Sequence, residues 1–170
     1  QAKRQLGTLD YDDLETLTAE LLQNSEEVRQ RYREREINHL LVDEFQDTND
    51  AQWRIVQSLV DLDKEGSLFI VGDAKQSIYA FRGADVTVFK DVQNELGQRT
   101  TGELLALTRS FRTHSKLIDV FNHFFQHHMQ PDALVDKYAG YVTYDDVLQA
   151  NRPSTSDAPF LHVVLLRDYP

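Results

Sequence analysis

The sequence contains no cysteine among its 170 residues, which excludes disulfide bonds and thiolate metal ligands. Glycine and proline are also few, and no segment is repetitive or of low complexity. No apolar run approaches the roughly 20 residues that a membrane-spanning helix needs, and no basic start followed by an apolar stretch suggests a signal peptide. The sequence therefore predicts a soluble protein of the cytoplasm, with no membrane partner.

Positive charge is scarce as well. The chain has 18 Lys and Arg residues against 28 Asp and Glu residues, a formal net charge of −10. Proteins that bind nucleic acid over a broad surface usually show a basic footprint. Any contact with DNA must therefore be local, through a few basic residues and aromatic stacking. The hydrophobic content of 41% suffices for one globular core or two small lobes.

Two apolar runs end in polar groups. Residues 37–42 run into Asp43 and Glu44, and residues 68–71 run into the polar segment 72–83. We expect both runs to be buried parallel strands, whose carboxyl ends form the edge of the sheet where ligands bind. An acidic pair at that edge is typical of a magnesium–nucleotide site. Strands commonly end in polar turns, so the acidic pair alone would be weak evidence, but the second turn makes the pattern specific.

Helices are predicted between these strands. Asp10, Ser25, either Thr48 or Asn49, and Asp85 stand where helix N-caps are expected. The alternation of strand, turn and helix indicates an α/β fold with a parallel, doubly wound sheet. Further along the chain, we expect a third strand at residues 104–107, a helix carrying Leu117 to Phe125, and a fourth strand at residues 160–166.

Three segments in this order resemble motifs II, III and IV of the superfamily 1 DNA helicases of the UvrD/Rep type. Residues 43–48 read DEFQDT, residues 72–84 read GDAKQSIYAFRGA, and residues 107–113 read LTRSFRT. Within motif III, Lys75 precedes the glutamine, and Phe81 replaces the tryptophan of UvrD and Rep. Both features are closer to the RecB and AddA helicase-nucleases.

The resemblance implies a fragment of a P-loop NTPase (RecA-like) motor, with a parallel sheet flanked by helices. Residues 1–97 would belong to the first motor domain, and residues 98–170 would open the second, with the polar stretch 97–102 as a linker. The phosphate-binding loop G-x-x-x-x-G-K-[ST] is absent from these 170 residues. We therefore expect an internal piece of a larger protein that is inactive as an ATPase by itself.

The resemblance also assigns the nucleotide site, with ATP and Mg²⁺ as cofactors. Asp43 would hold the magnesium ion, and Glu44 would orient or deprotonate the attacking water. Gln76 would sense the γ-phosphate, Phe111 would stack on the adenine, and Arg112 would act as an arginine finger between the motor lobes. An ordinary strand-end carboxylate and an ordinary turn glutamine are the alternatives for Glu44 and Gln76.

Single-stranded DNA is the second partner that the resemblance implies. Tyr79 and Phe81 would stack on bases, and Arg82 would contact DNA or brace the motif. Stacking on aromatic rings holds bases without reading their sequence. Packing in the core is the alternative for the two aromatic residues, and it is a real competitor for Phe81.

The function expected from these motifs is that of an ATP-dependent 3′–5′ DNA helicase or translocase in DNA repair or recombination. One alternative is the helicase component of a RecBCD- or AddAB-like exonuclease, with nuclease subunits as partners. Another is a non-catalytic motor-like module that binds DNA or protein. A stand-alone metal nuclease using Asp43, Glu44 and Asp47 fits poorly, because it gives the turn from Gln76 to Arg82 no purpose.

Overall fold

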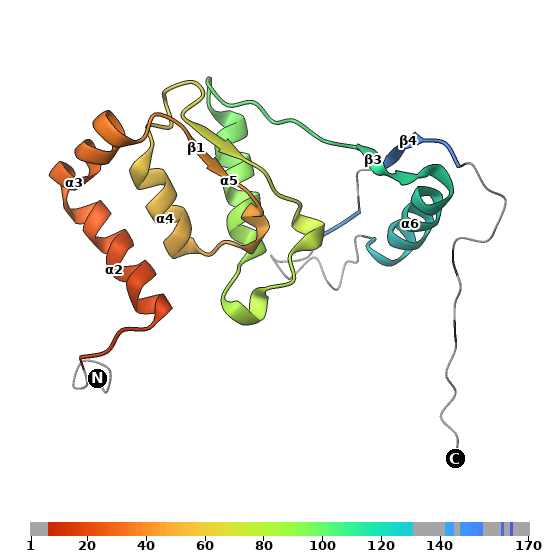
Figure 1. Cartoon of the computed structure of the whole chain (residues 1–170), viewed down its shortest axis with the longest axis horizontal. Coiled ribbons are helices and arrows are strands. Elements are labelled where there is room, and N and C mark those ends of the chain that lie inside the picture. The colour runs from red at the N-terminus through yellow and green to blue at the C-terminus, as the bar shows by residue number, and fades with distance from the viewer. Residues whose placement is uncertain (1–6, 131–141, 145–146, 155–160, 162–163, 165–170) are drawn as a thin grey trace, which may run out of the picture. The chain divides into compact units, whose positions relative to one another are not determined.

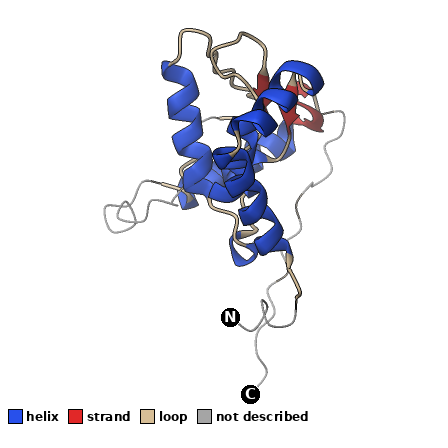
Figure 2. Ribbon diagram, turned by 90° about the vertical axis from the view of Figure 1, so that its left-hand side faces the viewer, coloured by secondary structure: helices blue, strands red, loops and turns tan. Residues whose placement is uncertain are grey.

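The computed structural model describes residues 7–130, 142–144, 147–154, 161 and 164. The chain divides into two compact units, Gln1–Leu104 and Leu105–Pro170. Helices make up most of the described part of the first unit, the described part of the second unit contains one helix, and the strands of both units are short (Figures 1 and 2). Within the described residues, no helix is long and apolar enough to cross a membrane.

The first unit contains a two-stranded parallel sheet. Strand β1 (Leu40–Val42) pairs with β2 (Leu68–Ile70), and Leu40 and Val42 lie opposite Leu68 and Ile70. Helix α4 (Asp50–Leu59) lies between them in the sequence, which gives a strand–helix–strand unit. This confirms the predicted parallel pairing of the two apolar runs.

The core of this unit lies against one face of the sheet. It is built on Phe45, on Trp53 of α4 and on Val92 of α5 (Val86–Gln98), and Val42 and Ile70 of the strands pack against it. The intervening residues Leu41 and Phe69 are 72% and 55% exposed. The prediction of two buried strands is therefore wrong for β1 and β2, in which the middle residue is exposed and its two neighbours are half-buried. A sheet covered by helices on one face buries only alternate residues.

The helix starts agree with the capping residues read from the sequence. Asp10 forms a capping box with Asp13 at the start of α2 (Tyr11–Asn24), and Asn49 forms one with Gln52 at the start of α4. Asp85 caps α5 by accepting from the backbone of Thr87. Such caps satisfy backbone N–H groups that have no partner inside the helix.

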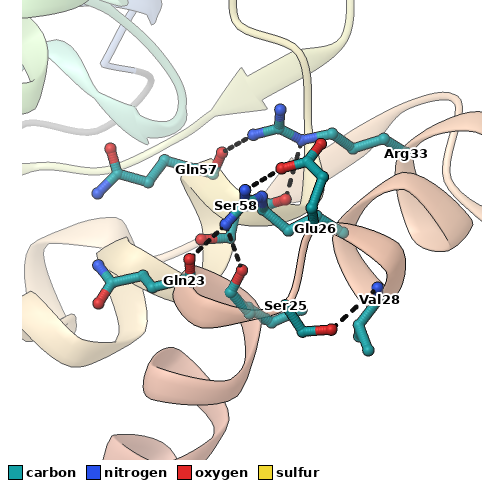
Figure 3. A network of polar contacts seen from close by, with 9 residues as sticks. Gln23, Ser25, Glu26, Val28, Arg33, Gln57 and Ser58 are labelled. Carbon is teal, nitrogen blue, oxygen red and sulfur yellow. Dashed lines mark hydrogen bonds and ion pairs between the residues drawn. The ribbon is translucent and has the colours of Figure 1, made fainter.

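One predicted helix after α2 is divided in two. Ser25 caps α3 (Glu26–Arg31), and the chain continues as a π-helix, η1 (Tyr32–Glu36). From η1, the guanidinium of Arg33 donates to the carbonyl oxygens of Gln57 and Ser58, each at 2.9 Å (Figure 3). These carbonyls lie at the carboxyl end of α4, where a cation is favourable. Arg33 thus connects η1 to the carboxyl end of α4.

The second unit is smaller in its described part. Strand β3 (Arg109–His114) pairs in parallel with β4 (Gln149–Arg152), and helix α6 (Ser115–His128) follows β3 directly. The predicted helix is confirmed in α6. The predicted strand at residues 104–107 is wrong, because Leu105 and Leu107 are 71% and 86% exposed outside any strand. Residues 109–114 instead have a strand partner. The strand expected at residues 160–166 falls outside the described residues except for residues 161 and 164.

Candidate functional site

The polar residues that end β1 and β2 lie at one edge of the sheet. The parallel pairing places Asp43 and Glu44 next to the segment that begins at Gly72. Backbone hydrogen bonds continue past the strands, since Val71 N–H donates to the carbonyl of Val42 and Phe45 N–H donates to the carbonyl of Val71. The two turns are therefore held together by the backbone as well as by side chains.

Glu44 has an unusual backbone. Its φ and ψ are 51° and 41°, in the left-handed region, and it is the single non-glycine residue with positive φ in the described chain. Such a conformation costs about 1–2 kcal/mol in a residue with a Cβ atom, and residues of this kind concentrate at functional sites. Its N–H donates to Asp43 Oδ1 at 2.9 Å, and both side chains are exposed. The acidic pair thus presents two carboxylates to solvent at the strand end.

Gln46 connects the two strand ends through its side chain. It lies in the 3-10 helix η2 (Phe45–Asp47) and is 1% exposed. Its Nε2 donates to Glu44 Oε2 at 2.6 Å, and its Oε1 accepts from the N–H of Asp73 at 3.0 Å. Ser77 Oγ donates to the backbone carbonyl of Gln46 at 3.1 Å. This one residue therefore contacts both predicted motifs.

Asp73 organises the turn that carries Gln76. Its Oδ2 accepts from Gln76 Nε2 at 3.0 Å, and its Oδ1 lies 3.0 Å from Lys75 Nζ. Partial burial raises the pKa of the Asp73 carboxyl, but the hydrogen bonds from Gln76 and from the side chain and backbone of Lys75 lower it further, so the net shift is downward. The carboxylate is thus kept ionised and fixes both neighbouring side chains.

Gly72 allows the two turns to approach closely. A Cβ atom at this position would lie 3.0 Å from Gln46 Oε1 and 3.2 Å from Phe89 Cε2. Both distances are shorter than ordinary van der Waals contact. A side chain at this position would therefore force the Gln46 carboxamide and the Phe89 ring to shift, which favours the glycine of motif III.

The next turn presents an aromatic pair with a cation. Tyr79 precedes the 3-10 helix η4 (Ala80–Arg82), and its ring centroid lies 5.8 Å from that of Phe81. The guanidinium carbon of Arg82 lies 5.3 Å from the Tyr79 ring and 5.5 Å from the Phe81 ring. Tyr79 is 37% exposed and Phe81 is 77% exposed. Core packing is thus excluded as the role of Phe81 in this structure.

Phe111 and Arg112 lie within β3 of the second unit, rather than after a strand as the sequence suggested. Phe111 is 65% exposed, and Arg112 is exposed too.

The acidic residues suit a magnesium ion shared with phosphates better than a metal site made by protein alone. Within the described residues, no group of three or more His, Cys, Asp or Glu side chains is placed to hold a metal ion. Magnesium in nucleotide sites is typically bound by one or two carboxylates together with water and phosphate oxygens. The exposed carboxylate of Asp43 fits that role.

Sequence reasoning did not single out Gln46 and Asp73 as site residues. Both stand inside the motifs quoted for the resemblance, at the second position after Glu44 and the third before Gln76. Their position in the motifs was the available signal. Their burial and their mutual hydrogen bond depend on how the two turns meet in space.

Comparisons with known proteins agree with the resemblance. Residues 1–97 match the UvrD/REP helicase N-terminal domain. The chain is 37% identical over 150 residues to an ATP-dependent helicase/nuclease subunit of Exiguobacterium sibiricum, an alignment that covers 86% of this chain and 12% of that protein. It is 35% identical over 166 residues to the protein of the same name in Listeria monocytogenes, with 92% and 13% covered.

A third relative carries a different name. The exonuclease/helicase subunit RexA of Streptococcus pneumoniae is 34% identical over 160 residues, with 94% of this chain and 12% of that protein covered. The chain thus spans 12–13% of the length of these relatives.

Proposed function

Because this chain belongs to the UvrD/Rep helicase family, in the RecB/AddA branch of helicase-nucleases, we propose that it works as an internal part of an ATP-dependent DNA helicase. We assign the longer protein 3′–5′ movement on single-stranded DNA, a role in DNA repair or recombination, and a cytoplasmic location. The observed mixture of helices with small parallel sheets is consistent with a helicase N-terminal domain. A RecA-like motor is the fold we propose, with residues 1–97 in the first motor domain and 98–170 in the second.

The observation that carries this proposal is that Gln46 joins the two strand ends. Hydrogen bonds connect Glu44, Gln46, Asp73 and Gln76 into one group, the strand-end cluster. Phosphoryl transfer depends mainly on positioning and on neutralising charge. We propose that Asp43 holds Mg²⁺, which when bound would neutralise charge on the phosphates. Glu44 would orient the attacking water and accept its proton.

Gln76 is proposed to respond to the γ-phosphate. Its amide nitrogen donates to Asp73 in this structure, and its side chain is exposed. It can therefore exchange a carboxylate oxygen for a phosphate oxygen without losing a hydrogen bond. For Phe111 and Arg112, adenine stacking and the arginine finger are supported by the motif and by the exposure of both side chains on β3.

Single-stranded DNA is the proposed ligand of Tyr79, Phe81 and Arg82. An exposed aromatic pair beside a guanidinium offers a stacking surface and a positive charge for the backbone. These three residues follow Gln76 by three to six positions, so one short segment would connect the nucleotide site with the DNA site.

A helicase–nuclease complex is a second form of the same proposal. The relatives are named helicase/nuclease and exonuclease/helicase subunits, and Lys75 and Phe81 agree with that branch. Nuclease subunits are thus proposed partners. A non-catalytic module that binds DNA or protein is less well supported, because Asp43, Glu44, Gln76 and Arg112 are all present.

Replacing Glu44 by glutamine in the full-length helicase tests the proposal. Glutamine keeps the size of the side chain but cannot accept a proton, so DNA-stimulated ATP hydrolysis should fall by about 10²–10⁴-fold. Binding of a fluorescent ATP analogue should be retained. Hydrolysis and binding would be measured by a coupled assay and by fluorescence anisotropy.

Glu65→Gln, at an exposed glutamate of the first unit, controls for the loss of one negative charge and should retain full hydrolysis. If nucleotide binding is lost with hydrolysis in Glu44→Gln, then Glu44 is a structural residue or a metal ligand. The 170-residue chain alone is expected to show no ATPase activity in the same assay, because its sequence lacks the phosphate-binding lysine and loop.

A further inference from the structure

Gln46 is a buried polar residue whose role the motif assignment leaves open. Its side chain is 1% exposed, yet it lies beside the exposed carboxylate of Glu44. Buried polar groups are costly unless their hydrogen bonds are satisfied. Both ends of this carboxamide are satisfied, and both partners belong to the strand-end cluster. We propose that Gln46 is a positioning residue that holds the carboxylate of Glu44 in place for hydrolysis, an inference that rests on the proposed function.

The chemistry of the two partners fixes the orientation of the carboxamide. Glu44 Oε2 can only accept, and the backbone nitrogen of Asp73 can only donate. The amide nitrogen of Gln46 must therefore face Glu44 at 2.6 Å, and its oxygen must face Asp73 at 3.0 Å. Rotating the amide by half a turn would set oxygen against oxygen and nitrogen against N–H. The Gln46 side chain thus has one stable orientation.

Glu44 depends on this contact. Among the described residues, the hydrogen bond from Gln46 is the only one that its carboxylate receives. The backbone of Glu44 is in the left-handed region, and its side chain is otherwise exposed. Without Gln46, the carboxylate would be free to sample other rotamers in solvent. A misplaced base loses much of its effect, since proton transfer requires hydrogen-bond distance.

Gln46 itself is held from the other turn. Ser77 Oγ donates to the backbone carbonyl of Gln46. Gly72 leaves room for the Gln46 side chain, because a Cβ atom at Gly72 would lie only 3.0 Å from Gln46 Oε1. Three hydrogen bonds run from Glu44 through Gln46 and Asp73 to Gln76. The position of the proposed base is therefore set by the same turn that carries the proposed γ-phosphate sensor.

Two substitutions in the full-length helicase separate positioning from packing. Gln46→Met keeps the volume and removes both hydrogen bonds, so we expect kcat for DNA-stimulated ATP hydrolysis to fall by about 10- to 100-fold, as for other residues that orient a reacting group. The KM for ATP should stay nearly unchanged, because the buried side chain of Gln46 is not accessible to a ligand that binds from solvent.

Gln46→Glu keeps the shape and the contact with Asp73 but sets a carboxylate against that of Glu44. Repulsion between the two carboxylates should push the side chain of Glu44 out of position. We therefore expect kcat to fall at least as far in Gln46→Glu as in Gln46→Met, again with a nearly unchanged KM for ATP. If Gln46→Met does not fold, Gln46→Glu alone still decides the question, because its side chain has the same size.

Gln52→Met is the matched control. Gln52 also makes two side-chain hydrogen bonds, to Asn49 N–H and to Glu15, but at the start of α4. The proposal predicts wild-type kcat for this variant. A kcat loss in Gln46→Met no larger than in Gln52→Met, or a wild-type kcat in Gln46→Glu, would show that Gln46 only fills the core.

Glu44→Gln distinguishes failure of this inference from failure of the proposed function. If hydrolysis survives in Glu44→Gln, the proposed function of Glu44 is wrong. If Glu44→Gln abolishes hydrolysis while Gln46→Met retains it, the proposed function stands and only the positioning role of Gln46 is overturned.

Discussion

The strand-end cluster of the first unit and the β3 residues of the second unit carry similar sequence signals in different surroundings. Glu44 and Gln76 are connected through Gln46 and Asp73, and the adjacent Phe45 is fully buried. Phe111 and Arg112, by contrast, are exposed on β3. In the first unit the chain itself fixes the site, whereas on β3 a ligand would have to position the side chains. Substitutions in the cluster of the first unit should therefore lower stability together with activity, whereas substitutions on β3 should lower activity alone.

Arg112→Ala should give the largest effect, a loss of ATP turnover, and should leave the stability of the fold unchanged. An arginine finger can contribute about 10³-fold or more to turnover, whereas an exposed arginine contributes little to folding. We expect kcat of the full-length helicase to fall by about that factor, at an unchanged unfolding midpoint. Arg109→Ala, an exposed arginine of the same strand, is the control. Equal losses in both variants would show that β3 needs positive charge in general.

Phe45→Ala should show the opposite pattern, with the main loss in stability. Phe45 is fully buried, and its ring packs edge-on against Trp53 at 5.7 Å between centroids and tilted against Phe89 at 5.9 Å. Removing a buried phenylalanine costs about 3–5 kcal/mol. Urea unfolding of the chain measures the loss. Phe81→Ala, at a 77% exposed phenylalanine, should change the free energy of unfolding by less than about 0.5 kcal/mol.

Tyr79→Ala and Phe81→Ala sharpen the comparison, because these residues belong to the first unit but are exposed. Each should weaken binding of a single-stranded oligonucleotide by about 1–3 kcal/mol where a base is stacked. The ATPase rate without DNA should stay near that of the wild-type protein, and no base preference should appear. Fluorescence anisotropy measures the affinity, and Tyr11→Ala, at an exposed tyrosine of α2, is the control. Unchanged DNA affinity in both variants would overturn the assignment.

Asp73→Asn should give the smallest effect, a change in the free energy of unfolding at acid pH. Its folded-state pKa is lowered by its hydrogen-bond partners despite partial burial, so its stabilising contribution is present above the unfolded pKa and is lost as the pH falls through the folded pKa. Asp73→Asn should remove this contribution, below about 1 kcal/mol, and flatten the acid side of the stability curve. Urea unfolding between pH 3 and pH 7 measures it. Asp91→Asn, at an exposed aspartate of α5, should leave the curve as it is.

Local chemistry made part of the fold predictable. Helix starts were predicted correctly at Asp10 and Asp85, and the structure selects Asn49 from the two alternatives Thr48 and Asn49, because an N-cap depends on a few adjacent residues. The parallel pairing of β1 and β2 followed from two apolar runs with a helix between them. Burial was overestimated at Leu41 and Phe69, since it depends on whether elements cover both faces of the sheet.

Contacts between segments that are distant in the sequence could not be predicted from local patterns. The apolar residues 104–107 resemble a strand but have no strand partner, whereas the polar segment Gln149–Arg152 forms β4 because it meets β3. In the site, the motifs point to Glu44 and Gln76. The burial of Gln46 and its bond to Asp73 join positions 27 residues apart, and no local pattern encodes such a meeting.

Two features of Glu44 act in opposite directions on the choice of residue at this position. Glycine adopts a left-handed conformation more readily than glutamate, so it would relieve a backbone cost of about 1–2 kcal/mol. Glycine would also leave the buried Nε2 of Gln46 without its acceptor, at a cost of about 1–3 kcal/mol. A library screened only for resistance to heat should therefore keep glutamate over glycine at position 44, even without selection for hydrolysis.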